Sequence, residues 1–150
     1  MDWLESLNLI VPGFVACAEF GFFAFVRPVL GRLPERFQLE VEQRLVRTHG
    51  RLLPIYTCIS VILLLIYALR FTQNNTANRA VWTAVFFFSA AAATSIWLNQ
   101  AIEQEIMNWN PEQLPADWKF VRRRWVIGQG LRSSLQLVGF ILFCISLGAR

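Results

Sequence analysis

The stretch that decides the fold is Asn99–Arg132, NQAIEQEIMNWNPEQLPADWKFVRRRWVIGQGLR, which joins two long apolar runs. Basic residues and tryptophans are concentrated in it, and its polar side chains continue into the apolar run on either side. Aromatic and basic residues at the ends of apolar runs are typical of a membrane boundary. We therefore expect the chain to be organised around one such boundary.

The composition of the whole chain supports a membrane protein. Its 150 residues are 55% hydrophobic and 16% charged, and the mean hydropathy is +0.43. Soluble domains are about 45–50% apolar and about 25% charged. The net charge of +4 comes from basic residues beside the apolar runs, where they set topology, so we expect membrane lipid and no nucleic acid as a partner.

Four apolar runs are long enough to cross a bilayer: residues 8–30, 52–71, 80–99 and 126–147. A helix rises about 1.5 Å per residue, so about 20 residues cross a hydrocarbon core. The first seven residues are acidic rather than basic, so we expect the first run to be a retained span and no cleaved signal. The sequence thus predicts one all-α domain over residues 1–150, a bundle of four transmembrane helices.

An amphipathic segment separates the first two spans. Apolar residues recur at helical spacing among charges over residues 33–46, and Pro34 suits the first turn of a helix. We predict a helix from Pro34 to about His49. It either lies on the membrane surface or extends the second span.

The third and fourth spans are also expected to extend beyond the bilayer. The small residues of Ser89–Ser95 allow close helix packing in lipid, and the apolar pattern continues to about Trp109. A polar turn is expected at 72–79 and another at 110–115. The last helix is then predicted from Ala116 to about Leu147.

The distribution of lysine and arginine predicts the orientation. They cluster between spans one and two and between spans three and four, and are sparse in the other loop and the termini. The positive-inside rule places both long loops in the cytoplasm and both termini outside.

Polar residues within or beside the spans are the candidate functional residues, because an ionisable group in a bilayer is costly unless it is paired or hydrated. Those residues are Glu19, Arg27, Asn99, Glu103, Gln129, Arg132 and Gln136. Asn99 and Glu103 are four apart, as are Arg132 and Gln136, so each pair shares a helix face. Arg27 lies near the end of its span, where its side chain is expected to reach the boundary.

Three interpretations of these residues remain open. One is a satisfied polar network in which Arg132 pairs with Glu19 or Glu103 and fixes the helix register. The second is a ligand pocket, an apolar cavity with a few convergent polar groups. The third is a proton or ion pathway.

Other residue types give weaker signals. Cys17, Cys58 and Cys144 lie in apolar runs without a CxxC pattern, so neither a disulfide framework nor a metal site is expected. The single histidine, His49, suits an interfacial or capping position, and its role stays open. The tryptophans mostly lie at span ends, and Trp125 is also a candidate for stacking on a planar ligand.

The stretch 99–132 resembles the DUF1772 family, membrane proteins that include anthrone oxygenases. The resemblance rests on Asn99, Trp109, the P-x-D-W of Pro115–Trp118, the R-x-R-W of Arg122–Trp125, and Arg132. The segments at 27–28, 32–34 and 42–54 are similar to one branch of that family.

The resemblance implies a four-helix fold and the oxidation of a phenol or anthrone by dioxygen, with neither metal nor flavin as cofactor. It assigns Arg132 to stabilising an enolate and Asn99 to donating a hydrogen bond. Many members have histidine where this chain has Gln129, and glutamine is no general base. Glu103, or Glu19, would then take the proton.

The predicted site therefore has two parts. The candidate catalytic residues are Arg132, Asn99 and Glu103, and the candidate substrate-binding residues are Glu19, Arg27, Trp125, Gln129 and Gln136. Whether the chain is an enzyme stays open. The alternatives are a non-catalytic subunit or assembly factor of a larger membrane complex, a homo-oligomer, or a carrier of a hydrophobic small molecule such as a quinone.

Overall fold

The computed structural model describes residues 2–70 and 75–149, and the regular elements of that range are all helices. Two of them, named η, are single π-helical turns. In chain order they are α1 (Trp3–Gly21), η1 (Phe22–Val26), α2 (Arg27–Leu30), α3 (Glu35–Arg70), α4 (Asn75–Thr94), η2 (Ser95–Asn99), α5 (Gln100–Met107) and α6 (Trp118–Gly148).

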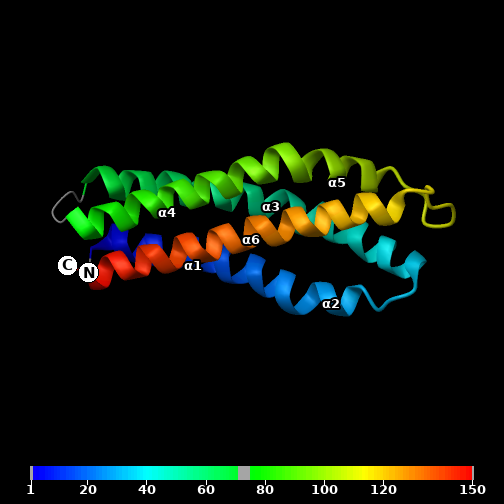
Figure 1. Ribbon diagram of the computed structural model, residues 1–150, viewed down its shortest axis with the longest axis horizontal. Coiled ribbons are helices and arrows are strands. Elements are labelled where there is room, and N and C mark those ends of the chain that lie inside the picture. Colours follow the sequence, from blue (N-terminus) through cyan, green and yellow to red (C-terminus); the bar gives the residue numbers. More distant parts are fainter. Residues whose placement is uncertain (1, 71–74, 150) are drawn as a thin grey trace.

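These elements make four long rods, because each π-helical turn continues the helices on either side of it (Figure 1). Each rod is long and apolar enough to cross a membrane: Trp3–Leu30, Glu35–Arg70, Thr76–Met107 and Trp118–Gly148. The prediction of an all-α, multi-pass four-helix bundle is confirmed. The described chain begins and stops at one end of the bundle, and residues 31–34 and 108–117 connect rods at the other (Figure 1).

Two extensions of the spans follow the sequence prediction. The amphipathic segment after residue 34 is continuous with the second span in α3, so it extends that span rather than lying apart from it. The third rod continues through η2 and α5 to Met107, close to the predicted end at Trp109.

Other boundaries differ from the prediction. The first helix begins at Trp3, five residues early, and the backbone N–H of Asp2 donates to the Glu5 carboxylate at its start, 3.1 Å away. The last helix begins at Trp118 rather than Ala116, because residues 110–117 still form turns and Asp117 is its N-cap. The predicted turn at 72–79 is shortened because α4 already begins at Asn75; residues 71–74, including the predicted end of span two, lie outside the described range.

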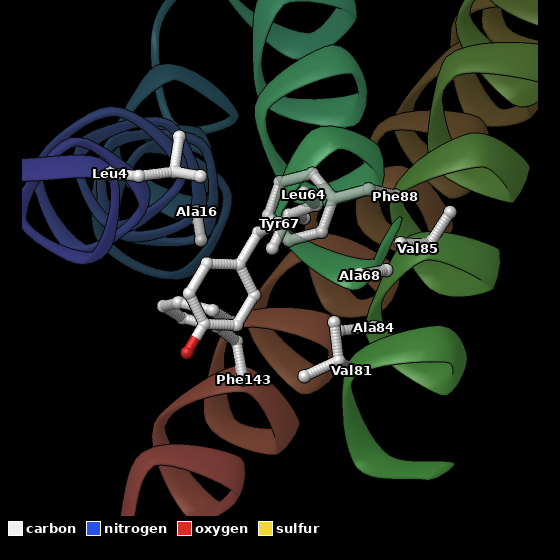
Figure 2. Packing of buried hydrophobic residues seen from close by; sticks show 10 residues of the cluster. All are labelled: Leu4, Ala16, Leu64, Tyr67, Ala68, Val81, Ala84, Val85, Phe88 and Phe143. Carbon is white, nitrogen blue, oxygen red and sulfur yellow. The ribbon is translucent and has the colours of Figure 1, made fainter. Parts of the chain in front are cut away.

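An apolar core joins α1, α3, α4 and α6 toward the end of the bundle where the described chain begins and stops. Figure 2 shows how its side chains pack. The ring of Tyr67 meets that of Phe143 edge-on at 5.2 Å, and Phe88 packs beside them from α4. Gly139 permits this packing, because a Cβ there would lie 2.9 Å from the Phe88 ring. Close approach of α4 and α6 through a small residue is what packing in lipid requires.

A second, smaller core lies toward the other end and joins α3, α5 and α6. Its buried residues are Leu39, Ile102, Ile106, Val121 and Trp125. The outward side chains of the rods are largely apolar, for example Ile55, Ile62, Phe86 and Ile141, which fits contact with lipid. Many of the buried polar residues, among them Glu19, Asn99 and Arg132, lie between these two cores along the rods.

Candidate functional site

Two glycines of α6 bring the rods together at the level of the polar residues. A Cβ at Gly130 would lie 2.6 Å from the Phe23 ring of η1, and one at Gly128 would collide with Oδ1 of Asn99, the last residue of η2. Both π-helical turns therefore pack onto one short segment of α6. Single π-turns inside α-helices are frequent at functional sites.

Arg132 and Glu19 form a buried ion pair across this level. Nη2 of Arg132 donates to Oε2 of Glu19 at 2.7 Å, and the two side chains are 4% and 3% exposed. Nη1 of Arg132 donates to the Ser95 hydroxyl at 3.2 Å. Of the two predicted partners of Arg132, the structure thus places Glu19 in the pair. A buried pair of this kind joins α1, η2 and α6 and constrains their register.

Arg27 makes a second buried pair instead of reaching the boundary. Its Nη1 donates to Glu42 at 2.9 Å, its Nε donates to the Gln129 side-chain oxygen at 2.8 Å, and its guanidinium lies 4.0 Å from the centre of the Trp125 ring. The expectation that Arg27 extends to the membrane boundary is wrong, since its side chain is buried. The physical reason is that Glu42 of α3 lies next to Arg27 and pairs with it. Arg122 also binds the Glu42 carboxylate, at 2.9 Å.

A small cavity lies beside these pairs, with a volume of about 10 Å³. This is about the smallest space that holds one water molecule. We call it the inner cavity, lined by Phe22, Arg27, Leu45, Val46, His49, Gly50, Glu103, Trp125, Gln129 and Arg132.

A larger pocket adjoins the inner cavity, with a volume of about 600 Å³. We call it the outer pocket, lined by Val46, Arg47, Gly50, Arg51, Pro54, Ser95, Ile96, Gln100, Glu103, Gln104, Met107 and Asn108. It lies between α3 and the η2–α5 segment, and half of its lining residues are exposed. Val46, Gly50 and Glu103 line both spaces, so they form the partition between them.

Glu103 is held in this partition from both sides. Its Oε1 accepts a hydrogen bond from Nε1 of Trp125 at 3.4 Å, and its Oε2 would lie 3.2 Å from a Cβ at Gly50. A glycine at residue 50 therefore gives the carboxylate room beside α3.

Several polar atoms at this level are buried without a hydrogen-bond partner among the described residues. They are Oε1 of Glu19, Nε2 of His49, both amide atoms of Asn99, and Nε of Arg132. Buried polar groups in proteins are almost always bonded to protein, water or ligand. The cluster can therefore accept and donate further hydrogen bonds to a small polar group.

The predicted site residues divide into three groups in the structure. Arg27, Glu103, Trp125, Gln129 and Arg132 line the inner cavity together. Glu19 and Asn99 lie just behind that lining, against Arg132 and Gly128. Gln136 lines neither space; its side chain is buried and donates to the Thr57 hydroxyl at 2.9 Å.

Sequence reasoning missed three residues of this site. His49 lines the inner cavity and packs on the Phe22 ring, with ring centres 4.8 Å apart. Ser95 binds Arg132, and Glu42 binds Arg27. One signal was available: Glu42 lies three residues after the buried Leu39 and so on the same helix face.

In the part of the chain that the structure describes, no three histidine, cysteine or acidic residues gather as a metal site. The three cysteines are free. The fold and site together define a four-helix membrane protein with a buried polar cavity beside an open pocket. Comparisons with protein-family models, curated proteins and solved structures found no match.

Proposed function

We propose that this protein binds a hydrophobic small molecule with a polar oxygen, of the phenolic or quinone-like kind, in the outer pocket. The observation that carries the proposal is the adjacency of a pocket of about 600 Å³ to a buried cluster of unpartnered polar atoms. Ligand sites are typically about 300–1,000 Å³, largely apolar, with a few convergent polar groups.

The position of the pocket suits a ligand that arrives from the membrane. On α3, exposed residues change from charged at Arg47 and Arg51 to apolar at Leu52 and Ile55. The outer pocket spans this change, with Ile96 on its apolar side. A ring system would lie along the apolar side while its oxygen points toward Glu103 and the inner cavity.

Binding of 2-naphthol and of 9,10-anthraquinone to the protein in lipid nanodiscs tests the proposal. Equilibrium dialysis against empty nanodiscs would measure it, and we expect saturable binding in excess of lipid partitioning. Gly50→Leu places a side chain in the partition, where even a Cβ would lie 3.2 Å from Glu103. We expect it to weaken binding at least about tenfold, the equivalent of about 1.4 kcal/mol.

The matched control is Gly148→Leu, because a Cβ at Gly148 meets nothing within 4 Å. Leucine is a better helix former than glycine at either position, so loss of helix is not expected in either variant. Unsaturable binding by the wild type, or equal affinity in Gly50→Leu, would contradict the proposal.

A second candidate function is oxidation of the bound molecule by dioxygen, which the DUF1772 resemblance favours. Its motivating geometry is the Arg132 cation at the inner cavity, where it would stabilise an enolate as charge develops. For anthrone, a proton leaves the ring carbon opposite the carbonyl, and dioxygen oxidises the resulting carbanion. One oxygen atom enters the quinone product and the other leaves as water.

An oxygen electrode distinguishes the two functions. Anthrone oxidation predicts oxygen uptake by nanodiscs above a heat-denatured control, and a lower rate for Gly50→Leu than for Gly148→Leu. Uptake no faster than the control would remove the oxygenase and leave the binding function. A non-catalytic subunit predicts instead a stoichiometric partner chain, and no small molecule, in native mass spectrometry.

A further inference from the structure

We propose that the inner cavity receives the hydroxyl group of a phenol and holds it as the anion, with His49 accepting the proton and Arg132 stabilising the oxygen. The inference rests on the proposed function and deepens it, because it selects a weakly acidic hydroxyaromatic ligand over a quinone.

The first support is the hydrogen-bonding capacity left over in the cavity. Arg132 uses Nη1 for Ser95 and Nη2 for Glu19, which leaves its Nε–H buried and unpartnered. His49 Nε2 is also buried and unpartnered within the described chain. A hydroxyl group donates one hydrogen bond and accepts others, so one hydroxyl satisfies a donor on Arg132 and an acceptor on His49.

The second support is size. The inner cavity holds about 10 Å³, and the outer pocket about 600 Å³. The smaller volume suits one oxygen atom, the size of a water molecule, and the larger suits a ring system. The two spaces are adjacent across Val46, Gly50 and Glu103, so a molecule whose ring lies outside places its hydroxyl inside by passing beside the Glu103 side chain.

The third support is the choice among possible proton acceptors. Oε2 of Glu19 is bound to Arg132, and Glu19 does not line the cavity. Glu103 lines it, but its Oε1 is occupied by Trp125. Among the described residues that line the cavity, His49 alone has a buried acceptor without a hydrogen-bond partner, and histidine takes up a proton near neutral pH.

Burial keeps His49 neutral before the transfer, so the imidazole is free to accept a proton. Burial, Arg132 of α6 and Arg27 of α2 disfavour the protonated imidazole, whereas Glu19 of α1 favours it, and the carboxylate of Glu103 on α5 lines the same cavity. The phenol O–H bond breaks and an N–H bond forms at Nε2, so the net charge of the site does not change. The resulting phenolate oxygen lies between the imidazolium and the Arg132 guanidinium.

A 7-hydroxycoumarin carrying an alkyl chain tests the inference, because its phenol and phenolate forms have separate excitation bands. Fluorescence polarisation reports binding to nanodiscs, and the ratio of the two bands reports ionisation of the bound probe. For the wild type near neutral pH we expect an anion band in excess of that in empty nanodiscs, saturating with the polarisation.

Two variants remove the proton acceptor in different ways. His49→Gln keeps a polar side chain, and His49→Phe keeps a ring to pack on Phe22. In both we expect retained polarisation and an anion-to-neutral ratio reduced at least about tenfold, one unit in the pKa of the probe. Glu105→Gln is the matched control, because Glu105 is exposed on α5 and lines neither space, and it should keep the anion band.

Each outcome is decisive. Absence of saturable polarisation in the wild type overturns the proposed function together with this inference. Bound probe that stays neutral, as when the cavity holds only a water molecule, overturns the inference alone. An anion band that survives in both His49 variants, or disappears in Glu105→Gln, also overturns it.

Discussion

Removing the charge of either Glu19 or Arg132 should be among the most destabilising changes in this protein. Their N–O distance is 2.7 Å and both side chains are buried. With an effective dielectric constant of about 20, two unit charges at this distance attract by about 6 kcal/mol. Leaving one partner of a buried pair without the other costs about 3–5 kcal/mol, whereas replacing both with apolar residues is often neutral.

We therefore expect Glu19→Leu and Arg132→Met each to lower the free energy of unfolding by about 3–5 kcal/mol. The double variant should lose much less than the sum of the two, giving a coupling energy of about 3 kcal/mol or more. Circular dichroism during unfolding with an anionic detergent in mixed micelles measures these values.

An exposed pair provides the control for this cycle. Lys119 and Glu35 lie 3.2 Å apart with side chains 74% and 54% exposed. Their coupling energy should be about 0.2–1 kcal/mol, as for other surface ion pairs. A Glu19–Arg132 coupling energy in this same range would mean that the two charges do not form a buried pair.

Three further predictions concern packing and the extent of the site. Gly128→Ala forces a Cβ into the neighbouring η2 segment, so it should cost about 1–3 kcal/mol of unfolding free energy; Gly21→Ala, with open space around its Cβ, should be neutral or stabilising by up to about 1 kcal/mol. Trp125→Leu removes the ring face beside Arg27 and should cost about 2 kcal/mol or more, measured by thermal unfolding in detergent. Gln136→Met should leave naphthol affinity unchanged in dialysis, because Gln136 lines neither the inner cavity nor the outer pocket; a tenfold loss would place it in the site.

The four rods and the presence of a polar cluster could be predicted from the sequence. Both depend on properties of single residues: the hydropathy of each side chain and the cost of burying each charge. Glu19 and Arg132 stand in apolar runs, and lipid cannot solvate them. Their need for partners follows from composition alone. Which partner each one takes depends on the direction in which its side chain points around the helix axis. The i, i+3 and i, i+4 spacing that predicts this direction assumes a regular α-helix.

The π-helical turns explain part of what those rules missed. η2 ends at Asn99, so the helix changes phase between the residues before and after it. Asn99 is buried against Gly128, while Glu103 lies one turn further, in the partition between the two spaces. Gln136 shares the Arg132 side of α6 but lies about 6 Å away along the helix axis, and its side chain bonds to α3 instead.

Long-range pairing accounts for the rest. Arg27 is buried because α3 extends beyond the predicted span and carries Glu42 alongside it. His49 looks interfacial in the sequence because it precedes the apolar run of α3. The sequence position alone does not show which residues of other helices pack against that part of α3. Neither contact follows from local periodicity.

Occupation of the outer pocket by a hydrophobic hydroxyaromatic molecule, with its oxygen at the partition, can be tested without assuming any chemistry. Photolabelling with a diazirine-bearing naphthol, followed by peptide mass spectrometry, tests this most directly. We expect labels within residues 46–54 and 95–108, the two segments that line the pocket. Unlabelled 2-naphthol should compete with them, and Gly50→Leu should remove them. Labels spread over lipid-facing side chains such as Ile62 and Phe86, without competition, would contradict occupation of the pocket.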